Sequence, residues 1–250
     1  MAWSVLQSAS NGNANFGPPL TATYGTNLSS GTTMLAFVCA FQQTTTSVAD
    51  ASSNAFTKLA SAGLNGSTAN GELSLWSLDT PAGDVGTKPV ITGTVTSTGS
   101  CSILIQEVSG LGATASQPDG TAGATGGTAS GTIGPPSYTS GTAGEYLLYL
   151  YGDSGDGATW TAPSGYSSDP NSSNASFACD LAVCYKNSTG GTETGTYSIN
   201  AGGTWELLMV ALKLSGPVVT SGPALPQQYP ARRPAIVVSN AGWRGGQHSR

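Results

Sequence analysis

Residues 33–41 read TMLAFVCAF, a run in which apolar side chains occupy nearly every position. Successive side chains of an extended strand point to opposite faces, so this run is apolar on both faces. Such a strand belongs in the middle of a sheet that is covered on both sides. Leu207–Leu212 (LLMVAL) has the same character. The sequence therefore predicts at least two fully buried central strands.

Other short runs, rich in β-branched and aromatic residues, surround these two, and turn-forming clusters bound each of them. None has the 3.6-residue periodicity of an amphipathic helix. These runs are Glu72–Leu78, Lys88–Thr96, Cys101–Val108, Glu145–Tyr151, Phe177–Tyr185, Glu193–Asn200 and Trp205–Leu214. The fold class is predicted to be all-β.

The runs repeat in order, with a period of about 105 residues: ILIQEVSGL at 103–111 resembles LLMVALKLSG at 207–216. The repeat divides the body into halves of about 1–112 and 113–216. Four or five strands per half are too few for two independent sandwiches. We therefore expect one jelly-roll-like antiparallel β-sandwich built from both duplicated halves, with two sandwiches side by side as the alternative. Residues 112–140 are expected to form a loop-like bridge with one short strand at Ser130–Ile133.

The composition supports a folded, weakly charged body. Only 8% of the 250 residues are charged, and 35 are Gly, against about 25% charged and 7% Gly in ordinary soluble domains. The N-terminus shows no secretory signal, and no apolar run reaches the length of a membrane span. We expect neither secretion through a signal peptide nor insertion in a membrane.

Catalytic and metal-binding patterns are sparse. The single histidine, His248, lies two residues from the end, so a Ser-His or Cys-His site in the body is not expected. Glu107 and Glu206 could in principle act as paired carboxylates, but we interpret them as edge or outward-facing strand acids. Without a CxxC or clustered histidines, no metal site, cofactor or enzymatic activity is expected.

The four cysteines are Cys39, Cys101, Cys179 and Cys184. Three of them lie within apolar runs, where a cysteine usually acts as a small buried hydrophobe. Buried thiols are the favoured interpretation. A disulfide is the alternative, and the sequence does not name its pairing.

The charges divide sharply between body and tail. Residues 1–216 hold four lysines against thirteen acids, which gives −9, and residues 217–250 hold four arginines and no acid. The tail is also rich in Pro and Gly, which favours an extended C-terminal arm. Such an arm suits attachment to an acidic protein surface, whereas its few arginines and the −9 of the body argue against nucleic acid. The candidate partner-binding residues are Arg232, Arg233, Ile236, Val237, Val238, Trp243, Arg244 and Arg250.

Two aromatic residues outside the apolar runs deserve a second hypothesis. Trp160 and Tyr166 lie in the loop-rich segment ATWTAPSGY and could stack on a sugar ring. Packing at a strand end is the competing explanation. A carbohydrate-binding adhesin module is thus an alternative function.

The opening Trp3–Ser10, the stretches GELSLWSLDTPAG and CSILIQEVSGL, the closing WELLMVALKLSG and the tail ARRPAIVVSNAGWRGGQHSR together resemble a known group. The resemblance is to Gly/Ser/Thr-rich β-sandwich proteins of tailed phages of high-GC Gram-positive hosts. It implies a non-enzymatic virion accessory protein, either a head decoration (minor capsid) protein or a minor tail protein. The implied partners are the major capsid or tail protein and further copies of this chain. The implied location is a virion assembled in the host cytoplasm.

Overall fold

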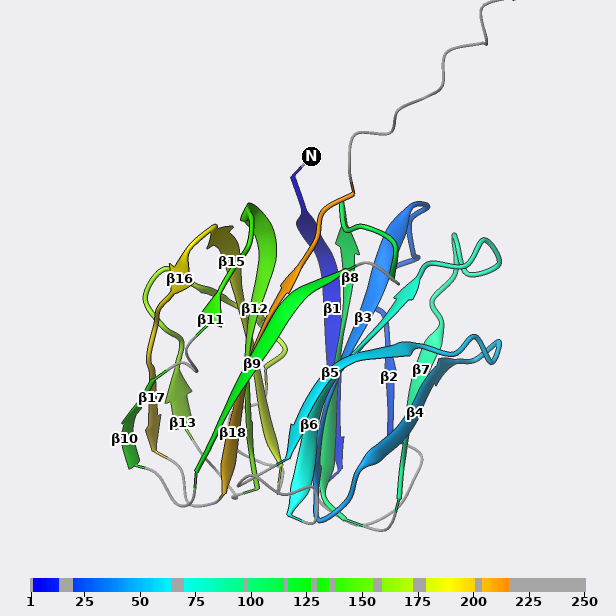
Figure 1. Cartoon of the computed structure of the whole chain (residues 1–250). Coiled ribbons are helices and arrows are strands. Elements are labelled where there is room, and N and C mark those ends of the chain that lie inside the picture. Colours follow the sequence, from blue (N-terminus) through cyan, green and yellow to red (C-terminus); the bar gives the residue numbers. More distant parts are fainter. Residues whose placement is uncertain are drawn as a thin grey trace, which may run out of the picture. The chain divides into compact units, whose positions relative to one another are not determined.

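The computed structural model describes residues 2–13, 20–63, 70–96, 99–114, 117–126, 130–134, 138–154, 159–172, 179–200 and 204–215. The chain divides into two units, Met1–Pro217 and Val218–Arg250. All described residues belong to the first unit. Within them every regular element is a β-strand (Figure 1), which confirms the all-β fold class.

The first half builds a large and a small antiparallel sheet. The large sheet has the order β1-β8-β3-β6-β5, with β1 Ser4–Asn13, β8 Cys101–Ser109, β3 Thr32–Phe41, β6 Gly71–Asp79 and β5 Thr57–Gly63. The small sheet has the order β2-β7-β4, with β2 Leu20–Thr23, β7 Val90–Val95 and β4 Thr45–Asp50.

The second half builds sheets of the same kind. The large sheet has the order β14-β15-β12-β18-β9, with β14 Ser167–Ser168, β15 Asp180–Thr189, β12 Ala143–Asp153, β18 Trp205–Leu212 and β9 Pro118–Gly126. The small sheet has the order β10-β17-β13, with β10 Ser130–Ile133, β17 Tyr197–Asn200 and β13 Thr159–Thr161. A further pair joins β11 Tyr138–Thr139 to β16 Thr192–Glu193.

The strand order of the second half repeats that of the first. Replacing β1, β8, β3, β6 and β5 by β9, β18, β12, β15 and β14 converts one large sheet into the other, and β2-β7-β4 likewise becomes β10-β17-β13. The first residues of β8 and β18 are 104 positions apart, and those of β3 and β12 are 111 apart. The duplication noticed in the long runs therefore extends to the short strands.

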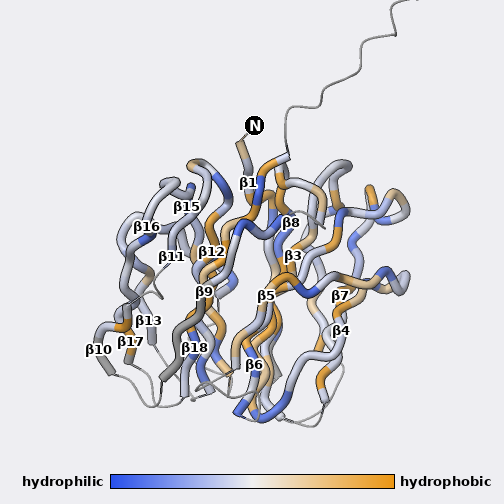
Figure 2. Tube along the Cα trace, in the orientation of Figure 1, coloured by the Kyte–Doolittle hydropathy of each residue, from blue (hydrophilic) through white to orange (hydrophobic). Residues whose placement is uncertain are grey.

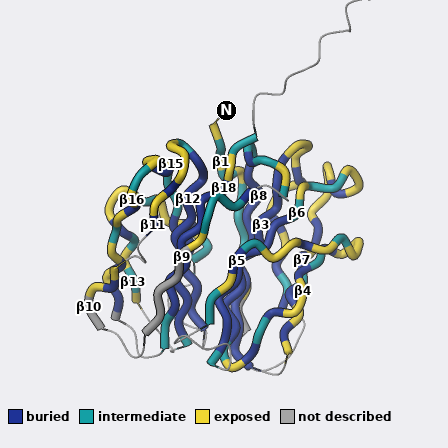
Figure 3. The backbone as a smooth tube through the Cα atoms, viewed as in Figure 1, coloured by how far each residue is buried: buried dark blue, intermediate teal, exposed yellow. Residues whose placement is uncertain are grey.

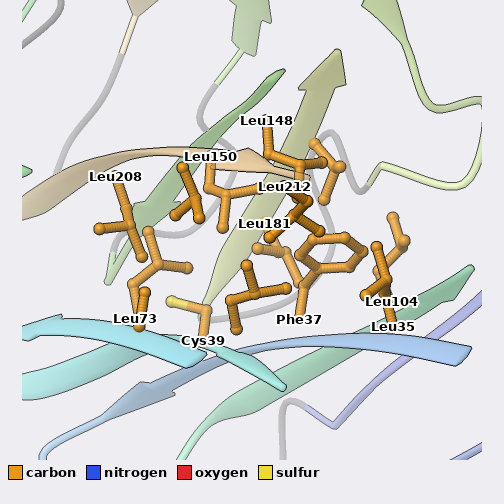
Figure 4. Close-up of a cluster of buried hydrophobic side chains, with 14 of the residues drawn as sticks. Leu35, Phe37, Cys39, Leu73, Leu104, Leu148, Leu150, Leu181, Leu208 and Leu212 are labelled. Atoms are coloured by element: carbon orange, nitrogen blue, oxygen red, sulfur yellow. The ribbon is translucent and has the colours of Figure 1, made fainter. Parts of the chain in front are cut away.

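The two large sheets pack face to face, and each carries its own small sheet on the other face. Along β3, Leu35 and Phe37 enter the core between the large sheets, whereas Met34 and Ala36 enter the core under the small sheet. The shared core (Figure 4) draws leucines from both halves. A third core lies between β12, β15 and β18 and the small sheet of the second half.

The two large sheets, one from each half, thus form the expected antiparallel β-sandwich, and a small sheet on each outer face brings the described body to four layers. The reason lies in the doubly apolar central strands, since each of their faces needs a covering layer. Figure 2 shows the apolar residues concentrated in these strands, and Figure 3 shows the same strands buried while the connections are exposed. The structure does not single out a jelly-roll connectivity.

The segment 112–140 is more ordered than expected. Within its described residues lie β9, which forms the edge of a large sheet, and β10 and β11. Gly, Ala and Thr dominate β9, so its sequence resembles a loop. Pairing with β18 over Thr121–Gly126 nevertheless makes it a strand.

The start of the chain, the link between the halves and the end of the described body meet at one place. The backbone N–H of Gly112 donates to the carbonyl of Lys213 (2.8 Å), and that of Ser215 donates to the carbonyl of Gly110 (2.9 Å). Gly110 has a φ of +81°, and the backbone of Ala2 fills the space that a Cβ would need. The last described residues are therefore held firmly by the body.

Candidate attachment site

The predicted partner-binding residues of the arm lie outside the described residues. They are Arg232, Arg233, Ile236, Val237, Val238, Trp243, Arg244 and Arg250. The structure does describe the point from which the arm departs. There Lys213 donates its backbone N–H to Gln117 (2.6 Å), and its ammonium lies 3.4 Å from the Asp119 carboxylate.

Most of the body's acids are interior groups. Asp156 lies outside the described residues, and of the other twelve acids Asp79 is exposed and Asp119 is partly exposed. The remaining ten are buried, with 5% exposure or less: Asp50, Glu72, Asp84, Glu107, Glu145, Asp153, Asp169, Asp180, Glu193 and Glu206. Few of the described carboxylates that make up the formal charge of −9 are therefore exposed to solvent.

Many of these carboxylates accept hydrogen bonds from backbone N–H groups in turns. Asp50 accepts from Ser52 (2.8 Å) and Asn54 (2.9 Å), and Glu107 accepts from Ser29 (2.6 Å). Buried backbone donors need partners, and a carboxylate is a strong acceptor for them. For Asp50 the sequence Asp50-Ala-Ser-Ser-Asn54 could have predicted this hydrogen bonding, because an Asp at the start of a polar turn commonly accepts from the backbone N–H two residues further on.

This distribution corrects one expectation. Glu107 and Glu206 are not outward-facing, because both are buried and lie on strands flanked by neighbours on either side. The expectation that the chain binds no nucleic acid, which rests on the net charge of the body and the few arginines of the arm, remains a prediction.

The buried acids differ in their ionisation. Burial alone would raise the pKa of Glu193, but hydrogen bonds from Ser140, the Thr189 backbone and Lys186 outweigh burial and lower it. Burial raises the pKa of Glu145 to about 7, and the neighbouring Asp119 contributes. Burial raises the pKa of Glu206 to about 8, and neither of its carboxylate oxygens has a hydrogen-bond partner among the described residues. Glu206 thus favours the neutral, protonated form.

The possible glycan-binding residues, Trp160 and Tyr166, both pack on the outer core of the second half. The Trp160 ring centroid lies 6.1 Å from that of Tyr197, and the Tyr166 centroid lies 5.7 Å from that of Tyr149. The ammonium of Lys186 lies over the Tyr166 ring, 4.5 Å from its centroid. Each ring thus has a packing role, and a cation already covers one face of Tyr166.

The sequence did not indicate a surface hollow at the boundary between the two halves, which we call the seam, where β1 of the first half meets residues 169–171 and Tyr185 of the second half. Its volume is about 340 Å³, and it is lined by Val5, Leu6, Gln7, Ser8, Pro170, Asn171 and Tyr185. Polar bonds cross this seam: Asp169 accepts from the Ser8 hydroxyl (2.9 Å) and from the Gln106 amide (2.7 Å). These residues come from distant positions, so only the folded chain assembles them.

Among the described residues, no three His, Cys, Asp or Glu side chains are grouped so that they could hold a metal ion. The same part of the chain holds no helix that is long and apolar enough to cross a membrane. Comparisons with protein-family models, with curated proteins and with solved structures gave no match.

Proposed function

We propose that this chain is a non-enzymatic structural component of a phage virion. The favoured role is that of a capsid decoration (minor capsid) protein that docks on the particle through its C-terminal arm. The resemblance of the strand runs and the tail to phage β-sandwich proteins supports this role. Its partners would be the major capsid or tail protein and further copies of the chain.

The observation that carries the proposal is the location of charge. The arm holds four arginines, whereas ten of the twelve described acids of the body are buried. Buried carboxylates are not exposed to a partner, so the proposal assigns the four arginines to acceptors on another molecule. Arginine is well suited to this, because its fork binds carboxylates bidentately.

The anchoring of Leu214 and Ser215 supports the same conclusion. Leu214 bridges Leu111, and Ser215 is bonded to Gly110. The last described residues before the arm are therefore joined to the link between the two halves, as a firm point of attachment for the arm requires.

Deletion of residues 217–250 tests the proposal. The truncated chain should keep the thermal unfolding midpoint of the full chain, because the described core ends at Ser215, and it should no longer enter particles. A full-length chain with all four arginines changed to Gln should also fail to enter, while the body variant Lys88→Gln should enter normally. Particles that take up the truncated chain as efficiently as the full chain would refute docking through the arm.

Two alternatives predict different results. A minor tail protein would be found on tails and be absent from tailless heads in the same uptake assay. A carbohydrate-binding module would bind a glycan array as the isolated body. Loss of that binding in Trp160→Ala would place the glycan at the outer core of the second half, whereas loss in Tyr185→Ala would place it at the seam hollow.

A further inference from the structure

Two cysteines from opposite halves meet in the shared core. Cys39 lies in β3, and Cys179 immediately precedes β15, 140 positions later. In the structure both are fully buried free thiols, as the sequence favoured, and their Sγ atoms are 2.7 Å apart. We propose that Cys39 and Cys179 form a disulfide bond that covalently locks the two halves of the body together.

The surroundings leave room for this bond. Gly152, in β12 of the second half, faces the same place: a Cβ added to it would lie 3.0 Å from the Cys39 sulfur and 3.3 Å from the Leu73 Cδ1. A glycine at position 152 therefore provides the space that the sulfur of Cys39 occupies. The sulfurs need to approach by only about 0.7 Å to reach the bonded separation of roughly 2.05 Å.

The other two cysteines belong to different cores. Cys101 lies in the core under the small sheet of the first half, and Cys184 lies in the outer core of the second half. Cys39 and Cys179, in contrast, both belong to the core between the two large sheets. The proposed pairing is thus the one that the layered architecture brings together.

Formation of the bond removes two electrons and two protons from the thiol pair. A low-molecular-weight disulfide of the glutathione type can accept them in two exchange steps. One cysteine thiolate attacks the small disulfide and releases the first small thiol. The second cysteine then attacks the mixed disulfide and releases the second small thiol. Because both sulfurs are inaccessible in the closed body, and because thiols stay reduced in a cytoplasm, the exchange takes place when the halves open after the particle has left the host cell.

The direct test uses the full-length chain, unfolded with reductant and refolded in a buffer of reduced and oxidised glutathione. Free thiols are then alkylated under denaturing, non-reducing conditions, and the chain is digested with pepsin for mass spectrometry. We expect two of the four cysteines to be alkylated and a peptide pair joining Cys39 to Cys179. Cys184→Ser, the matched control, should keep this peptide pair, and Cys179→Ser should lose it.

A thermal measurement on the same samples adds a readout that does not need the variants to fold. The oxidised chain should unfold about 4–16 °C above the reduced chain, because the bond closes a long loop. Alkylation of all four cysteines after oxidative refolding to the native fold would overturn the proposal. A cross-link that joins any other pair would overturn it equally.

Discussion

Glu206 offers the sharpest test of the energetics of the body. It is fully buried, its carboxylate has no hydrogen-bond partner in the described part of the chain, and burial raises its pKa to about 8 from an ordinary value of 4.5. In the unfolded chain the carboxyl ionises near pH 4.5, whereas in the folded chain it keeps its proton until about pH 8. Between these values the folded state binds the extra proton, so stability falls as pH rises.

The size of the effect follows from the shift. One pKa unit corresponds to about 1.4 kcal/mol, so the interval from pH 5 to pH 8 costs about 4 kcal/mol. Glu206→Gln carries no ionisable group and avoids this loss. The free energy of unfolding of Glu206→Gln, minus that of the unchanged protein, should therefore increase by about 4 kcal/mol from pH 5 to pH 8.

Guanidinium unfolding at pH 5, 6, 7 and 8 measures this difference, and titration of other groups cancels in the comparison. Glu193→Gln is the matched control. Its carboxylate has a lowered pKa, so the stability it contributes is lost only as pH falls below about 4.5. Its difference from the unchanged protein should be negative and constant over pH 5–8. Parallel pH profiles for Glu206→Gln and the unchanged protein would refute the assignment of a neutral, buried Glu206.

Two further changes test the packing between the halves. Gly152→Ala should destabilise the body by about 1–3 kcal/mol in thermal unfolding, because the added Cβ would crowd Cys39 and Leu73. Gly83→Ala is the control: a Cβ at position 83 would meet nothing within 4 Å, so this variant should be nearly neutral. Equal midpoints for the two alanine variants would contradict the close approach. Asp169→Ala should cost about 2–3 kcal/mol in urea unfolding, because it leaves the buried Gln106 amide without its carboxylate partner. Asp169→Asn keeps one acceptor oxygen and should lose less, and no loss in either variant would show that the seam bonds do not stabilise the body.

The sequence predicted the long central strands well. Runs such as TMLAFVCAF are apolar on both faces, and no position in a fold other than the middle of a covered sheet suits them so well. It did not predict β2, β4, β9 or β13, whose Thr, Ala, Ser and Gly residues are typical of loops. Such strands form because they pair with segments that are distant in the sequence, and the residues of the strand itself do not reveal that pairing. Without these strands, the two small sheets that form the outer layers could not be predicted.

The charge of the body shows a second limit. Composition gives the number of acids, but whether a carboxylate is buried depends on donors supplied by distant segments, as for Glu107 and Ser29, 78 positions apart. The proximity of Cys39 and Cys179 could not be foreseen for the same reason. The arm, in contrast, is inferred from its composition alone, and it remains a prediction.

A reconstruction of the virion is the most direct test of the central claim that this chain attaches through its arm. The account predicts the four-layered body on the outside of the particle, with density for residues 217–250 running from the end marked by Ser215 onto an acidic surface of the major capsid or tail protein. A body seated on the particle through its sheets, with the arm residues making no contact, would contradict it. So would virions that lack the chain.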